Sequence, residues 1–207
     1  MKIIKPSFKF LDDVDGKSIL RKLEFIGRQC YKSEGVITED SAPAFIANII
    51  KRGHESVLEH EKITVLIVCD RGVSHELVRH RIASYTQEST RYCNYSKDKF
   101  GNELTFIRPL FWEENSEYYN RWLASMQCAE TTYLNMIQSG AQPQQARSVL
   151  PNSLKTSIVV TMNIRSWRNF FKLRTAKTAH PQMIEIASMM LKEFKNVMPV
   201  LFDDIEG

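Results

Sequence analysis

The chain has 207 residues, of which 43% are hydrophobic and 25% charged, with a formal net charge of +4. These values are typical of a globular protein that is large enough to bury a core within one domain. No apolar run approaches the roughly 20 residues that cross a bilayer, and the segment Met1–Pro6 has no apolar signal core. We therefore expect a cytoplasmic protein that neither spans a membrane nor is secreted.

The hydrophobic pattern predicts helices and two strong strands. Ser18 is expected to cap an amphipathic helix that begins with Ile19 and Leu20. The apolar, β-branched segments 62–69 and 154–164 are predicted strands. The other predicted elements are helices over 39–51 (stopped by Gly53), 73–82, 115–138 (ended by Gly140), 166–175 and 181–197.

Two strands among many helices predict an α+β fold. We expect a single domain over residues 1–207, with a central, mostly antiparallel sheet flanked by helices. The sequence has no repeat, low-complexity tract or long linker that would divide it.

The four cysteines favour neither a disulfide framework nor a zinc ribbon. Cys30, Cys69, Cys93 and Cys128 are widely and irregularly spaced, and no two form a Cys-x-x-Cys pair. We expect them to be reduced and to occupy packed positions.

Basic residues are concentrated in one part of the chain. Residues 131–184 contain seven lysines and arginines and no acidic residue, whereas the rest of the chain has a net charge of −3. Such a zone attracts anions. A solvated basic face would explain it equally simply, but Asn163, Trp167, Asn169 and Phe170 are poor choices for such a face.

The segment from Ser74 to Tyr92 combines arginines, histidines and hydroxyl groups. Arginine forks and hydroxyls are the groups that bind phosphate and carbonyl oxygens, so the segment predicts a site for a phosphorylated ligand. Within the predicted helix 73–82, Arg81 shares the apolar face of Leu77, while Arg79 points about 200° away. A buried Arg81 would need an anionic partner, and an internal salt bridge to Glu59 or Glu76 is the simplest one.

The residues after Ile82 are predicted to form a polar loop. Its hydroxyls and backbone amides could wrap a phosphate, with Arg91 adding charge. An ordinary hydroxyl-rich turn is the alternative. Ser89 lacks a dedicated His–Asp pair, which argues against a nucleophile.

Two familiar motifs are excluded by spacing. His54 and His60 are six residues apart and His75 and His80 are five apart, whereas a zinc-protease helix needs histidines at i and i+4. Gly16-Lys17-Ser18 lacks the first glycine of a P-loop, and the chain has no Gly-x-Gly-x-x-Gly motif. We therefore expect no catalytic metal site, no P-loop and no Rossmann-type cofactor site.

Four blocks of sequence resemble the flavin-dependent thymidylate synthases. Arg79-His80-Arg81, seven residues and Ser89 resemble the Arg-His-Arg-x7-Ser signature of that family. The other three blocks, in chain order, are Arg52–His60, Ala146–Pro151 and Asn163–Arg174. Together the blocks extend over positions 52–174, which is most of the chain.

The resemblance implies roles for individual residues. The FAD-binding positions would be His54, Ser56, Glu59, Arg79, His80, Arg81, Ile82, Asn163, Arg165 and Asn169. The dUMP-binding positions would be Glu76, Arg79, Gln87, Glu88, Ser89, Thr90, Arg91, Arg147 and Arg174. Many relatives carry Gln at the position of Glu76, so direct contact of this carboxylate with the nucleotide is open, and His180 is only a weak candidate.

Arg174 is the catalytic candidate. As C5 of uracil attacks an electrophilic carbon, enolate character develops at the O4/N3 side, and a fixed guanidinium would stabilise that charge. Without the resemblance, a cation at a helix C-terminus would be the simpler interpretation of Arg174.

The resemblance implies a complete reaction. The protein would use FAD to methylate dUMP to dTMP. NADPH would be the reductant, methylenetetrahydrofolate would be the one-carbon donor, and tetrahydrofolate would be released. No cysteine nucleophile would take part. The family assembles as homotetramers with shared active sites, and neither nucleic acid nor membrane is an expected partner.

Two other hypotheses remain open at this point. The basic zone and its aromatic residues would also suit a nucleic-acid-binding module. The arginines and hydroxyls would suit a hydrolase or transferase of another phosphorylated metabolite, although no acid–base pair at motif spacing supports it.

Overall fold

The computed structural model describes residues 1–206, which fold into two compact units. Unit 1 comprises Met1–Ser7, Ile67–Arg79 and Thr86–Val159. Unit 2 comprises Phe8–Leu66, His80–Tyr85 and the described residues from Val160 onward. The single domain over 1–207 therefore stays a prediction, and each unit is described by itself.

The strands form two sheets. A four-stranded antiparallel sheet has the order β2-β3-β6-β4, and β1 pairs in parallel with β5. The strands are β1 (Lys2–Ile4), β2 (Ser7–Phe10), β3 (Lys62–Asp70), β4 (Ala83–Gln87), β5 (Thr105–Ile107) and β6 (Lys155–Asn163). In β6, residues from Thr156 to Met162 alternate between buried and half-buried, as in a sheet with one covered face. The predicted α+β class with an antiparallel sheet is confirmed.

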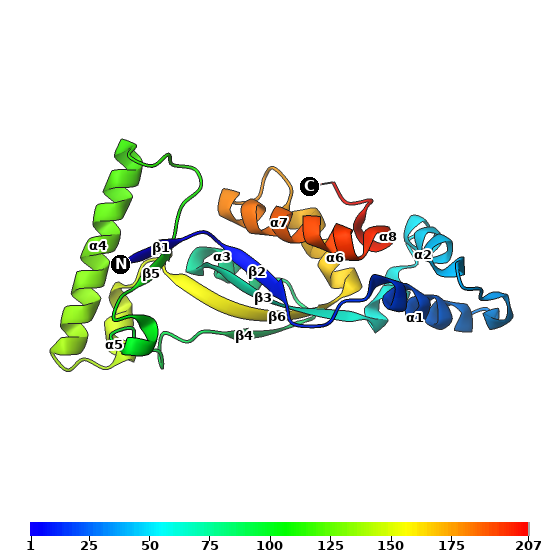
Figure 1. Ribbon diagram of the computed structural model, residues 1–207, viewed down its shortest axis with the longest axis horizontal. Helices are drawn as coiled ribbons and strands as arrows, with labels where there is room; N and C mark the ends of the chain where they lie inside the picture. Colours follow the sequence, from blue (N-terminus) through cyan, green and yellow to red (C-terminus); the bar gives the residue numbers. More distant parts are fainter. Residues whose placement is uncertain (207) are drawn as a thin grey trace. The chain divides into compact units, whose positions relative to one another are not determined.

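Unit 1 has its core beneath its longest helix. The helices are α3 (Arg71–Leu77), α4 (Glu117–Gln138) and α5 (Pro143–Ala146), with short 3-10 turns η3 (Asp98–Phe100) and η4 (Arg147–Val149). α4 lies beside β1 and β5 (Figure 1), and Tyr119, Trp122 and Tyr133 from α4 pack around Phe106 of β5. Gly140 follows α4 with a φ of 95°, so the predicted end of this helix is confirmed.

Unit 2 is built around buried aromatic residues. Its helices are α1 (Gly16–Gln29), α2 (Ser41–Lys51), α6 (Ile164–Arg174), α7 (Pro181–Val197) and α8 (Pro199–Phe202), with 3-10 turns η1 (Glu34–Val36) and η2 (Glu55–His60). α7 and α8 pack together, and α7 packs on α6 (Figure 1). Trp167 and Phe170 of α6 are fully buried, and the Trp167 indole donates to the Ile63 carbonyl oxygen at 3.0 Å.

The start of α1 differs from the prediction. Asp15, rather than Ser18, caps this helix: its carboxylate accepts from the backbone amides of Lys17 and Ser18. Gly16 lies so close to the end of α7 that an added Cβ would be 2.0 Å from the Val197 carbonyl oxygen. Gly16-Lys17-Ser18 is therefore a packed helix start.

One guanidinium of the basic zone is fully buried. Arg168 is 1% exposed, donates twice to the Asp204 carboxylate at 2.7 Å, and also donates to the Leu201 carbonyl oxygen. The hydrogen bonds from Arg168 lower the pKa of Asp204. This pair fixes the C-terminal segment of unit 2 to α6.

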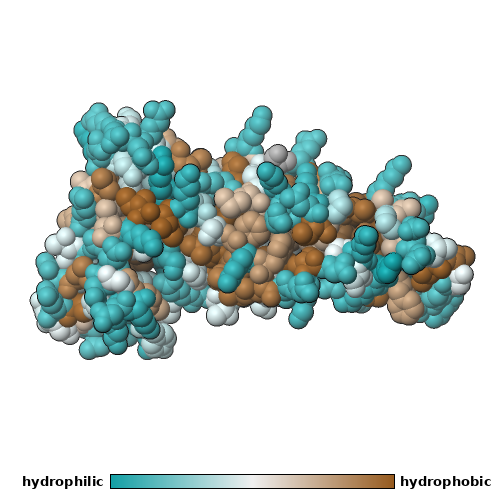
Figure 2. Space-filling view, viewed as in Figure 1, coloured by the Kyte–Doolittle hydropathy of each residue, from teal (hydrophilic) through white to brown (hydrophobic). Residues whose placement is uncertain are grey.

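Hydrophilic residues cover much of the surface in view, and hydrophobic residues gather toward the middle of that view (Figure 2). Within residues 1–206, no helix combines the length and hydropathy required to traverse a bilayer.

Candidate functional site

A pocket of about 490 Å³ lies in unit 2. Its wall combines the residues around the start of α6 with the segment that follows the first arginine of the Arg-His-Arg triplet. The lining residues are Glu55, Glu59, His80, Arg81, Ile82, Asn163, Arg165, Ser166, Asn169 and Lys172. The structure therefore brings seven of the predicted FAD-binding residues together: Glu59, His80, Arg81, Ile82, Asn163, Arg165 and Asn169.

Helix α6 presents its polar face to this pocket. Asn163 caps the helix, and its side-chain oxygen accepts from the Ser166 amide at 2.8 Å. Arg165, Asn169 and Lys172 follow at helical spacing and line the pocket. The opposite face carries the buried aromatic residues, which fix the helix in place.

Two cations of the pocket, Arg165 and Lys172, lie beside carboxylates. Arg165 donates to Glu59 at 2.6 Å, with the two side chains 51% and 46% exposed. Glu55 lies 3.8 Å from Arg165 and 4.0 Å from Lys172. Glu55 is only 22% exposed, whereas both members of the Arg165–Glu59 pair are exposed. Such an exposed pair is weak because water and salt compete for both charges, so an anionic ligand could replace Glu59 at Arg165.

The Arg-His-Arg triplet is not helical. α3 ends at Leu77, and Ile82 has a φ of 63°, a left-handed conformation that an α-helix does not allow. The predicted helix over 73–82 is thus too long. Arg81 is exposed, so its predicted apolar environment is wrong. Val73 and Leu77 are buried as expected, but the helical spacing of buried residues does not continue to Arg81.

His80 connects the triplet to the catalytic candidate. The Nε of Arg174 donates to Nε2 of His80 at 2.8 Å, and the His80 ring packs edge-on against Phe170 with ring centroids 5.0 Å apart. Burial, together with the positive charge of Arg174, lowers the pKa of His80 to about 4. His80 is therefore neutral at physiological pH.

The predicted phosphate loop begins as a strand in the structure. Residues 83–87 form β4, so the prediction of a loop directly after Ile82 is wrong. At the end of β4, the Gln87 amide nitrogen donates to the hydroxyls of Ser74 and Thr156 at 2.8 and 3.1 Å. Both hydroxyl residues are fully buried, so the amide of Gln87 is held in one orientation.

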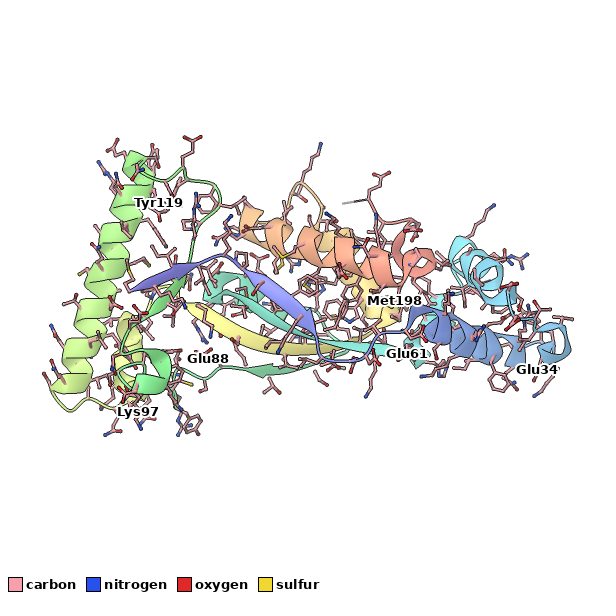
Figure 3. All side chains as sticks on the ribbon, viewed as in Figure 1. Glu34, Glu61, Glu88, Lys97, Tyr119 and Met198 are labelled. Atoms are coloured by element: carbon pink, nitrogen blue, oxygen red, sulfur yellow. The ribbon has the colours of Figure 1, made fainter. Side chains whose placement is uncertain are left out.

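Glu88, which is labelled in Figure 3, belongs to a hydrogen-bonded network of unit 1. One carboxylate oxygen accepts from the Tyr95 hydroxyl at 2.8 Å, and the other from Lys155 at 2.7 Å. Burial first, and the Glu88 charge second, raise the pKa of Tyr95. Glu88 therefore acts as a structural partner here.

Arg91 and Arg147 are exposed in unit 1. Arg91 donates to Gln144 at 3.2 Å, three residues before Arg147, and its guanidinium lies 5.2 Å from the Tyr92 ring centre. The hydrogen bond to Gln144 thus places Arg91 beside the segment that contains Arg147. Glu76, Arg79, Ser89 and Thr90 are also in this unit.

Some predicted and observed features differ. His54 and Ser56 are exposed and do not line the unit 2 pocket. The sequence analysis did not identify Lys172 as a pocket residue, although Lys172 lies inside the Asn163–Arg174 block. It also did not identify Ser74 and Thr156 as hydrogen-bond partners of Gln87, because only the tertiary structure brings these residues together.

Cys30 and Cys128 are exposed, so the expectation of packed positions is wrong for them. Among residues 1–206, no group of three His, Cys, Asp or Glu is arranged to hold a metal ion.

Comparison with known proteins gives consistent matches. Residues 16–200 match the family described as thymidylate synthase complementing protein. A flavin-dependent thymidylate synthase from Pyrococcus abyssi is 39% identical over 158 residues, which cover 76% of this chain but only 64% of that protein. One from Geobacter sulfurreducens is 36% identical over 184 residues, covering 86% of this chain and 78% of that protein.

A solved structure shares the fold. The crystal structure of the UMP/dUMP methylase PolB from Streptomyces cacaoi bound with 5-Br dUMP superimposes with a TM-score of 0.79 at 20% identity. The match covers 98% of this chain and 96% of that one.

Proposed function

This chain belongs to the flavin-dependent thymidylate synthase family, and from that premise we propose that it methylates dUMP to dTMP and releases tetrahydrofolate. The single observation that best supports the proposal is the unit 2 pocket, where His80 and Arg81 of the Arg-His-Arg motif line the same wall as Asn163, Arg165 and Asn169. These residues come from two of the motif blocks and are far apart in sequence.

The pocket fits a cofactor that carries a diphosphate, such as FAD. Arg81, Arg165 and Lys172 offer positive charge, and Asn163 and Asn169 offer amides. Glu59, the carboxylate partner of Arg165, is exposed enough to be replaced by a phosphate oxygen. When bound, FAD reduced by NADPH would supply the reducing equivalent, and methylenetetrahydrofolate would supply the one-carbon unit.

We assign the polar residues of unit 1 to dUMP. Arg91 and Arg147 suit a phosphate group, and Gln87, Ser89 and Thr90 suit the neutral oxygens and N–H groups of a nucleotide. Glu76 and Arg79 are assigned by resemblance. Glu88, whose two oxygens already accept hydrogen bonds, would support this segment from behind.

Arg174 would activate the uracil ring. It is half-buried and is bonded through Nε to a neutral histidine, so its positive charge is not cancelled by that partner. A fixed guanidinium would stabilise negative charge at O4 as C5 becomes nucleophilic. Arg174 would stabilise the transition state, in which this negative charge develops, more than the ground state.

We assign no nucleophilic role to a cysteine. Burial raises the pKa of the Cys69 thiol, which disfavours the thiolate. A folded variant lacking Cys30, Cys69, Cys93 and Cys128 should retain dUMP-dependent turnover, and a folded but inactive variant would contradict this assignment.

A homotetramer in the cytoplasm, with neither nucleic acid nor membrane as partner, remains part of the proposal. The nucleic-acid alternative lost support because the basic zone is not one exposed face: Arg168 is buried against Asp204 and Arg174 is bonded to His80. Among the described residues 1–206, no contact favours hydrolysis of another phosphorylated metabolite.

The first experiment is the visible absorption spectrum of the purified protein, before and after anaerobic NADPH, with and without dUMP. We expect a flavin spectrum that bleaches, with a bleaching rate that dUMP changes, and dTMP after methylenetetrahydrofolate is added. A protein that stays colourless after incubation with FAD and makes no dTMP would overturn the proposal.

A further inference from the structure

We propose that His80 is a positioning residue for Arg174: its imidazole Nε2 accepts the Nε–H of Arg174 at 2.8 Å and thereby sets the plane of the guanidinium. This inference rests on the proposed role of Arg174 in activating dUMP. It adds a function for His80 that differs from direct binding of the flavin.

The hydrogen bond defines the state of the imidazole. Arginine has donors only and keeps its proton, so Nε2 of His80 must be the acceptor. A histidine that accepts through Nε2 is neutral and carries its proton on Nδ1. The low pKa of His80 agrees with that state.

His80 is itself fixed by its surroundings. Phe170 packs edge-on against the ring at 5.0 Å, and the Tyr85 hydroxyl donates to the His80 backbone oxygen at 2.7 Å. Phe170 and Arg174 are four residues apart on α6, so one helix face supplies both the packing surface and the guanidinium. The imidazole is thus a fixed reference for the arginine.

The consequence for Arg174 follows from the shape of a guanidinium. The group is planar, so fixing Nε and the direction of its N–H also fixes the plane that contains both Nη atoms. Because the charge is preorganised where it is needed, the guanidinium does not have to be oriented after substrate binds.

The first test detects the bond without turnover. In the full-length protein labelled with ¹⁵N-arginine, the Nε–H signal of Arg174 is assigned by its loss in Arg174→Lys. We expect slow exchange with water in the wild type and in His80→Gln, whose amide oxygen reaches about as far as Nε2. We expect fast exchange in His80→Leu, and no change in the control His75→Leu, which alters an exposed histidine. Equal exchange rates in the wild type and His80→Leu would overturn the proposal.

The second test uses a double-mutant cycle on holoenzyme whose flavin content is checked by absorbance. We expect His80→Leu to lower kcat for dTMP formation at least about tenfold, with flavin retained, and His80→Gln to recover most of it. In the Arg174→Ala background, His80→Leu should have no further effect. Additive losses, or a loss explained entirely by missing flavin, would overturn the positioning role.

The two tests separate the two proposals. If the wild type formed no dTMP, the proposed function would fail, while the exchange measurement would still decide whether His80 holds Arg174. If dTMP formed normally but exchange and coupling were absent, only the positioning role would fail.

Discussion

Charged side chains are organised in opposite ways in the two units. In unit 1, Glu88 is 12% exposed and both its oxygens accept hydrogen bonds from neighbouring side chains. In the unit 2 pocket, Glu59 and Arg165 form a pair in which each side chain is about half exposed. The same residue types therefore stabilise the fold in one region and remain exchangeable in the other, and burial separates the two roles.

Helix α6 contains both kinds of charge within a few residues. Arg168 is buried beneath the helix and bound to Asp204, whereas Arg165 faces the pocket. The comparison thus applies within one element as well as between units. Four substitutions test it.

The largest effect is expected for Arg168→Ala. Removing this fully buried guanidinium deletes its hydrogen bonds to Asp204 and to the Leu201 carbonyl oxygen, which should lower the free energy of unfolding by about 3 kcal/mol. Urea denaturation measures this change. The matched control is Arg165→Ala on the same helix, which should leave the unfolding midpoint almost unchanged; equal losses in both variants would contradict the distinction between buried and exposed charges.

Arg174→Ala should have the next largest effect, on turnover. Loss of the charge that stabilises the uracil oxyanion should reduce kcat by roughly 10²- to 10³-fold. The flavin spectrum should persist, because Arg174 does not line the pocket of unit 2. Normal dTMP formation by this variant would remove Arg174 from the catalytic role.

The sequence predicted the regular elements well where hydrophobic periodicity was strong. The long helix ending near Gly140, the helix over 181–197 and the two central strands all form, because their apolar residues face a core. Short strands such as β1 and β5 have three residues each, too few for a period to be recognised. Their pairing depends on tertiary context.

The site was predictable through motifs, but its geometry was not. The motif blocks named seven residues of the pocket. The pattern Val73–Leu77–Arg81 indicated a helix, yet the chain leaves the helix after Leu77 and adopts a positive φ at Ile82, a backbone choice that no side-chain period encodes. The bond between His80 and Arg174 joins residues 94 positions apart and was likewise invisible.

Glu88→Gln tests the structural side of the comparison. The amide can still accept from Tyr95 but loses its charge opposite Lys155, so we expect a loss of about 1–2 kcal/mol in unfolding free energy. Glu117→Gln is the control, because its pair with Arg121 is exposed on α4, and it should cost at most about 0.5 kcal/mol. A Glu88 variant as stable as the wild type would mean that this network does not stabilise unit 1.

Glu59→Gln tests the exchangeable side and should have the smallest effect. Stability should not change measurably, since the pair with Arg165 is exposed. If phosphate oxygens must displace Glu59 to reach Arg165, removing the competing charge should lower the dissociation constant for FAD roughly two- to fivefold. Fluorescence titration of the flavin-free protein measures this constant. The gain in FAD affinity should be smaller at high salt, because salt screens the attraction of Arg165 for Glu59 as well as its attraction for phosphate. Weaker FAD binding in Glu59→Gln would instead mean that this carboxylate contacts the cofactor directly. Glu59 would then not be an exchangeable partner of Arg165, and its exposure would not distinguish its role from that of Glu88.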